Sequence, residues 1–217
     1  MPEEARPGSG EQAKQYALGR LRETILRGGM APAQRLVENE LAERYGVTRA
    51  SIRAALLDLA SEGLVERIRN RGSRVRVVTI EEAVEITECR MALEGLCAAK
   101  AAEVATDAQI DELTDLGRAM SEAVAGGDPV SYSELNHDLH TLIRVISGQR
   151  TAVALLERLN AQLVRHRFRL ALRPGRPKQS LSEHLAVVEA ISARDPRAAE
   201  GAVRAHLSSV IDALRDD

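Results

Sequence analysis

Three histidines and one asparagine in the second half of the chain are the residues best suited to bind a metal ion. Asn136 and His140 are four residues apart, so on a helix they point the same way. His184 precedes Asp195 by 11 residues and His206 follows it by 11. If the chain reverses at Asp195, the two imidazoles lie at similar heights. The spacing therefore predicts that three imidazoles and one amide converge, and imidazoles favour transition metals over magnesium or calcium.

The same residues leave other functions open. A single histidine in a helix is more often a hydrogen-bonded core or surface group than a ligand, so the hypothesis depends on the convergence. Three histidines with an open position could also activate water in a metalloenzyme. Hydrolysis needs a positioned general base, however, and Glu183 directly precedes His184, which turns it about 100° away on the helix. We expect no enzymatic activity.

The elements that must position these side chains are helices. Asp128 with Pro129 and Asp195 with Pro196 are typical helix starts, and Gly148 is a typical stop. With no tryptophan and one phenylalanine, the core must be aliphatic, which suits helix packing. We expect an antiparallel bundle of six helices, spanning about residues 80–104, 107–126, 128–147, 150–171, 179–193 and 195–215.

The first part of the chain has a helix-turn-helix pattern. Gly46 ends a short apolar-periodic helix at a position where a left-handed residue costs little. Thr48 is a good N-cap for a second helix over Arg49 to Glu62, and Gly63 ends it.

Arg49 and Arg53 give this second helix its chemistry. They are four residues apart near its start, so they share one face. In the major groove, arginine makes bidentate hydrogen bonds to guanine. The hydroxyls of Thr48 and Ser51 could bond phosphates.

A basic β-hairpin follows. Leu64–Ile68 and Ser73–Val78 alternate apolar and charged residues, and Asn70–Gly72 supplies the turn. This pattern predicts a wing, with Arg71 at its tip as a DNA contact. Its edge could instead be a charged surface that prevents aggregation. Its five arginines are Arg67, Arg69, Arg71, Arg74 and Arg76.

Charge and composition divide the chain. Residues 1–80 carry a net charge of +4 and residues 81–217 a net charge of −6, so the first part should face nucleic acid. We expect a flexible tail over 1–12, a winged helix-turn-helix over 13–78 and a helical bundle over 80–215, in a mainly α protein. The sequence has neither a signal peptide nor a long apolar run, so we expect a cytoplasmic location and no membrane partner.

The first part resembles the winged helix-turn-helix of GntR-type bacterial transcription regulators. The resemblance implies DNA contacts by Arg35, Thr48, Arg49, Arg53 and Gly72. Ser51 and Ala54 depart from it, because many members have proline and glutamate there. The residues that carry the match are Leu36, Glu38, Leu41, Ala42, Gly46, Val47, Thr48, Arg49, Ile52, Arg53, Leu56, Leu59, Glu62, Gly63, Leu64 and Gly72.

The second part resembles the FCD domain of the FadR-like group of these regulators. The match is carried by Arg90, Leu93, Glu94, Asn136, His140, Glu183, His184, His206 and Leu207. It implies one divalent transition metal per chain, zinc first and nickel or manganese as alternatives, on Asn136, His140, His184 and His206. Asn136 stands where aspartate is commonest, which makes a neutral and weaker ligand. The alternative is a metal-free polar cavity. Arg90, Glu94 and Arg144 are the candidates for effector binding.

Together these features predict a homodimeric transcriptional regulator, a repressor rather than an activator. Two recognition helices would read an inverted repeat in double-stranded operator DNA. A small carboxylate bound in the bundle would modulate the affinity. The alternative is a metal-dependent hydrolase-like enzyme with an attached DNA-binding domain.

Overall fold

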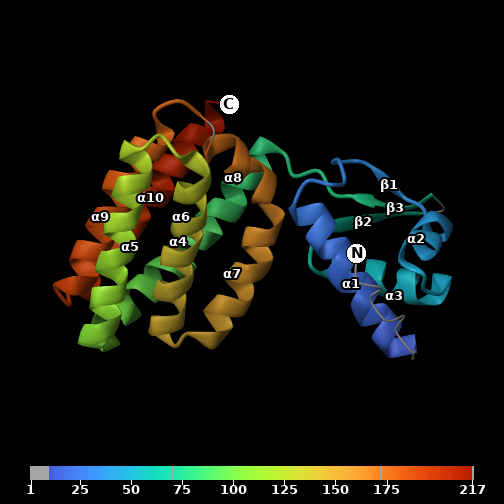
Figure 1. Ribbon diagram of the computed structural model, residues 1–217, viewed down its shortest axis with the longest axis horizontal. Coiled ribbons are helices and arrows are strands. Elements are labelled where there is room, and N and C mark those ends of the chain that lie inside the picture. The colour runs from blue at the N-terminus through green and yellow to red at the C-terminus, as the bar shows by residue number, and fades with distance from the viewer. Residues whose placement is uncertain (1–9, 70, 172, 217) are drawn as a thin grey trace. The chain divides into compact units, whose positions relative to one another are not determined.

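The computed structural model describes residues 10–69, 71–171 and 173–216 (Figure 1). The chain forms two compact units that divide between Val78 and Thr79. Most of the expected tail lies outside the described residues, and Gly10–Gln12 already belong to the first helix. Among the helices of the described residues, none is long and apolar enough to cross a membrane.

The first unit is a winged helix, as predicted. Its three-stranded antiparallel sheet has the order β1-β3-β2, with Arg35 opposite Arg74 and Val65 opposite Val75. Two elements add to the predicted pattern, namely helix α1, which packs on α3, and the two-residue strand β1. The elements are α1 (Gly10–Leu26), β1 (Arg35–Leu36), α2 (Glu38–Tyr45), α3 (Arg49–Ser61), β2 (Val65–Ile68) and β3 (Gly72–Val75).

The turn between α2 and α3 has the expected chemistry. Gly46 ends α2 with φ of 64°, the left-handed region where a side chain is unfavourable. The Thr48 hydroxyl accepts a hydrogen bond from the Ser51 amide at 3.1 Å and so caps α3. These two residues fix where the recognition helix begins.

The second unit is all helical, and its other helices pack around α4, drawn in green in Figure 1. α4 packs against α6, α7, α9 and α10. Its small buried residues, including Gly95, Ala98 and Ala102, let α10 approach closely. The helices are α4 (Ile80–Val104), α5 (Asp107–Ala125), α6 (Pro129–Ser147), α7 (Arg150–Gln162), α8 (Val164–Ala171), α9 (Arg176–Ser192) and α10 (Pro196–Arg215).

The number of helices in this unit differs from the prediction. The described residues form seven helices rather than six, because the expected helix over 150–171 breaks at Leu163 into α7 and α8. There the Leu163 amide bonds to the Asn160 carbonyl three residues back, and the Leu163 side chain is buried. α9 begins at Arg176 rather than at 179, since Pro177 fits the first turn of a helix.

Candidate metal centre and nucleic-acid interface

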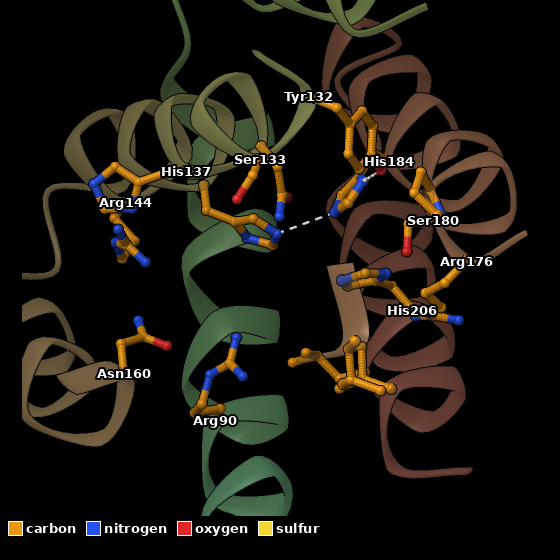
Figure 2. Close-up of a pocket in the computed structure, with 16 residues that line it drawn as sticks. Arg90, Tyr132, Ser133, His137, Arg144, Asn160, Arg176, Ser180, His184 and His206 are labelled. Atoms are coloured by element: carbon orange, nitrogen blue, oxygen red, sulfur yellow. Dashed lines mark hydrogen bonds between the residues drawn. The ribbon is translucent and has the colours of Figure 1, made fainter. Parts of the chain in front are cut away.

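A small cavity lies inside the helical unit (Figure 2). Its volume is about 90 Å³, whereas sites for drug-sized ligands span roughly 300–1,000 Å³. The polar and charged residues that line it are Arg90, Tyr132, Ser133, Asn136, His137, His140, Arg144, Asn160, Arg176, Ser180, His184 and His206. Such a cavity suits an ion with a few waters or a small polar molecule.

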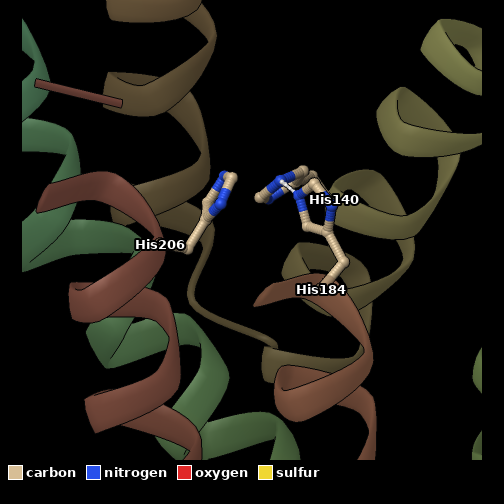
Figure 3. Close-up of side chains that lie close together, drawn as sticks. All are labelled: His140, His184 and His206. Carbon is tan, nitrogen blue, oxygen red and sulfur yellow. Dashed lines mark hydrogen bonds between the residues drawn. The ribbon is translucent and has the colours of Figure 1, made fainter. Parts of the chain in front are cut away.

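The three predicted histidines meet in this cavity (Figure 3). His140 comes from α6, His184 from α9 and His206 from α10, and one nitrogen of each lies within 4.8 Å of the others. The Nε2 atoms of His140 and His184 are 3.1 Å apart. The predicted convergence of the imidazoles is therefore present in the structure.

Each of the three rings contacts a protein oxygen through its other nitrogen. The partners of the Nδ1 atoms of His140, His184 and His206 are, in order, Glu94 Oε2 at 3.0 Å, the Tyr132 hydroxyl at 3.2 Å and Glu183 Oε2 at 2.7 Å. In metal sites such partners fix the tautomer and the orientation of the ring. The Nε2 atoms are therefore the ones that would face an ion, which would replace the hydrogen bond between the Nε2 atoms of His140 and His184.

The protonation states suit metal binding. Burial lowers the pKa of His140 to about 4, against the opposing charge of Glu94. Burial and the charges of His206 and His140 lower the pKa of His184 well below its usual value. Burial by itself would raise the pKa of Glu94, but Arg90 and His140 hold it well below its usual range. At neutral pH the His140 and His184 rings are neutral, which is the form that binds a cation.

Asn136 is a further candidate donor. It lies one helical turn before His140 and lines the same cavity. Its Oδ1 atom is buried and has no hydrogen-bond partner among the described residues. A buried acceptor without a partner is costly, and an unfilled ligand position accounts for it. Three imidazoles and one amide oxygen fit a transition metal.

The three arginines of the cavity differ in how their charge is balanced. Arg90 is paired with Glu94 Oε1 at 2.8 and 3.0 Å. Arg176 donates to Ser209 at 2.6 Å and to Glu183 at 3.3 Å.

Arg144 is balanced differently. It donates to Thr141 at 2.8 Å, and no carboxylate of the described residues lies within ion-pair distance of it. Burial lowers the pKa of Arg144. It is the cavity arginine whose charge an anion would best balance.

The predicted effector residues are only partly as expected. Arg90 and Arg144 line the cavity, whereas Glu94 is not among the lining residues and instead holds Arg90 and His140. Sequence reasoning missed Tyr132 and Arg176. Tyr132 lies four residues before Asn136, so helical spacing offered a signal. Arg176 stands at a helix start, where spacing offers none.

All the predicted nucleic-acid contacts except Ser51 are exposed. Arg49 and Arg53 are exposed on α3, with 62% and 57% of their side chains accessible. Arg35, Thr48, Arg71 and Gly72 are also exposed, and Gly72 has φ of 87° at the start of β3.

Ser51 departs from the prediction. Its side chain is buried, and its hydroxyl lies 3.0 Å from that of Thr48 and 3.5 Å from the Gly10 carbonyl oxygen. It supports the start of α3 from inside the unit rather than from the exposed face.

Comparison with known proteins gives two family matches. Residues 14–75 match the model described as bacterial regulatory proteins, gntR family, and residues 85–209 match the FCD domain. The HTH-type transcriptional repressor NanR of Citrobacter rodentium is 32% identical over 205 residues, covering 80% of this chain and 74% of NanR. The HTH-type transcriptional repressor RspR of Escherichia coli is 28% identical over 195 residues, covering 90% of this chain and 86% of RspR. The solved structure of E. coli McbR/YncC shares the fold, with a TM-score of 0.76 at 22% identity over 94% of this chain and 97% of that one.

Proposed function

The chain belongs to the gntR family of bacterial regulatory proteins and carries an FCD domain, and on that premise we propose that it is a transcriptional repressor controlled by a small anionic effector. The family consists of DNA-binding regulators and not of enzymes, so the hydrolase alternative is set aside.

One observation carries the metal proposal: three histidines from three helices converge, and each has its Nδ1 atom held by a neighbouring side chain. We assign the ion to His140, His184, His206 and Asn136, with one divalent transition metal per chain, zinc first and nickel or manganese as alternatives. Such an ion would act as a Lewis acid, with open coordination positions for a carboxylate. The protein's own part is to keep His140 and His184 neutral and to orient the three rings.

The cavity argues for a small effector with two kinds of polar group. Arg144 is partly buried and has no carboxylate partner among the described residues, so it favours an anion. The buried Oδ1 atom of Asn160 also lacks a hydrogen-bond partner there, so it favours a donor such as a hydroxyl or an ammonium. The effector proposed is a small carboxylate with at least one such donor.

The first unit would bind the operator DNA. Arg49 and Arg53 would read base edges in the major groove, with Arg35, Thr48, Arg71 and Gly72 against the backbone. A cytoplasmic homodimer would place two such helices on an inverted repeat. Effector binding lowers DNA affinity if the ligand-bound protein prefers a conformation with weaker DNA contacts.

Elemental analysis tests the metal. About one transition metal per chain is expected in the purified protein and none in His140→Ala. His137→Ala is the matched control, since His137 lies on the same helix outside the histidine cluster, and it should keep the metal. Asn136→Asp should bind the ion at least about tenfold more tightly in chelator competition, because a carboxylate replaces a neutral amide. Equal metal content in all variants would refute the assignment.

Selection from a random-sequence duplex library tests DNA binding and identifies the operator sequence in the same experiment. The protein should enrich an inverted repeat. Some members of a panel of small hydroxy and amino acids should then dissociate the protein from the selected duplex. Arg144→Gln should keep the selected sequence and lose the release. Failure to enrich any sequence, with or without metal, would overturn the repressor proposal.

A further inference from the structure

Glu38 holds an arginine of the recognition helix in place. Arg53 donates to Glu38 through Nε, at 3.1 and 3.2 Å, and through Nη2, at 2.8 Å. Arg49, one turn earlier on α3, lies with its Nη2 atom 3.9 Å from the same carboxylate. One carboxylate thus serves the two arginines that would read bases.

The fold anchors the carboxylate rather than the arginines. Glu38 is the first residue of α2. It lies two residues after Leu36, which is buried and pairs with Ser73 in the sheet. Its side chain is 29% exposed, about half the exposure of either arginine. The bond from Arg53 and the charges of Arg53, Arg49 and Arg67 lower the pKa of Glu38, so it stays ionised.

The geometry decides which edge of the guanidinium remains available. Glu38 occupies the edge formed by Nε and Nη2, which leaves the end edge formed by Nη1 and the second hydrogen of Nη2. That end edge offers two parallel donors, as bidentate recognition of guanine requires. A free arginine would sample many rotamers and lose that freedom on binding.

We propose that Glu38 is a positioning residue that presents the end edge of Arg53 to the base and so sets sequence preference rather than overall affinity. This inference rests on the proposed function, in that α3 faces the operator. An exposed ion pair contributes little to folding, so stability alone gives little reason for this bidentate arrangement. If Glu38 only offset charge, neutralising any acidic residue nearby on α2 would have the same effect.

Glu38→Gln and Glu40→Gln separate the two explanations. Both remove one negative charge from α2, but Glu40 is exposed and makes no ion pair with any described residue. Each variant is passed through the random duplex library, and its affinity for the wild-type selected site is compared with that for a scrambled duplex by fluorescence anisotropy. Glu38→Gln should lower this selectivity ratio about tenfold and relax one guanine position. Glu40→Gln should keep the wild-type base preference.

An Arg53→Ala background shows whether Glu38 acts through Arg53. There, adding Glu38→Gln should change the base preference no further. Thermal melting checks that each variant is folded; if Glu38→Gln is not, Glu38→Asp keeps the charge, shortens the reach and should show the same relaxed position.

Two outcomes would overturn the inference alone, with wild-type protein still selective. One is an unchanged selectivity ratio and base preference in Glu38→Gln, and the other is an equal effect of Glu38→Gln with and without Arg53. A wild-type protein that enriches no sequence would overturn the proposed function together with the inference.

Discussion

At the scale of single residues, the site depends on how each imidazole is held. A histidine ring has two nitrogens, and the partner of one determines which atom the other presents. The side chains of Glu94, Tyr132 and Glu183 contact the Nδ1 atoms of the three rings, and they come from three different helices. These three partners belong to the protein itself, so they would hold the rings in the orientation that an ion needs.

The buried histidines should make the metal-free protein sensitive to acid. The pKa of His140 is about 4 in the folded state, while an unfolded histidine titrates near 6.5. Between these values the unfolded chain binds more protons, so stability falls as the pH is lowered from about 6.5 towards 4. The loss for His140 alone is on the order of 3 kcal/mol. Urea unfolding in the presence of a chelator at several pH values measures it.

A His140→Gln variant serves as the control for that series. Because glutamine does not titrate, this variant should lose less stability than the wild type over the same pH range. Equal slopes in both proteins would contradict the assignment of the effect to His140.

Sequence spacing predicted part of this site. Asn136 and His140 share a helix face by their four-residue spacing, and His184 and His206 are symmetric about Asp195, so their convergence was predictable. Glu183 was judged only against its neighbour His184, although it contacts His206 on another helix. Contacts between helices depend on their rotation and packing, which local spacing does not specify.

At the scale of helices and strands, the capping residues, glycines and prolines at helix ends predicted most boundaries. Asp128 and Asp195 cap α6 and α10 through their side chains, each followed by proline, as expected. The break at Leu163 was missed because the residues beside it, Gln162 and Val164, are neither glycine nor proline. A buried leucine there is compatible with a continuous helix, so only tertiary packing distinguishes the two outcomes.

Two glycines of the helical unit should respond oppositely to alanine. Gly148 ends α6 with φ of 65°, so Gly148→Ala should lower the free energy of unfolding by about 1 kcal/mol. Gly201 is exposed inside α10, and no atom would crowd an added Cβ there. Gly201→Ala should raise stability by up to about 1 kcal/mol. Urea denaturation compares them, and effects of the same sign would contradict this reading of the backbone.

At the scale of the whole molecule, the chain consists of two units with separate tasks. The helical unit has its own core, built from α4, α5, α6, α9 and α10. The net charge is +4 over residues 1–80 and −6 over residues 81–217. An acidic second unit is not attracted to a polyanion, so nucleic-acid affinity should come from the first unit.

The helical unit should therefore be separable. A fragment of residues 79–217 is expected to fold cooperatively by thermal melting, to hold one metal per chain and to bind no duplex, because its core and its histidines lie within it. Full-length His140→Ala, studied in parallel, distinguishes loss of the ion from loss of folding. A fragment that is unfolded even with metal present would show that the two units depend on each other.

The hydroxyl of Tyr132 beside His184 has a spectroscopic consequence. The chain contains no tryptophan and three tyrosines, of which Tyr16 and Tyr45 lie in the first unit. Tyr132 is the single tyrosine of the helical unit. Because the chain has no tryptophan to accept the excitation energy, tyrosine fluorescence can be observed directly. Its hydroxyl bonds to an imidazole of the site, so we expect its emission to change when that imidazole binds an ion. In a fragment of the helical unit alone, tyrosine emission would therefore report on binding at the site without an added label.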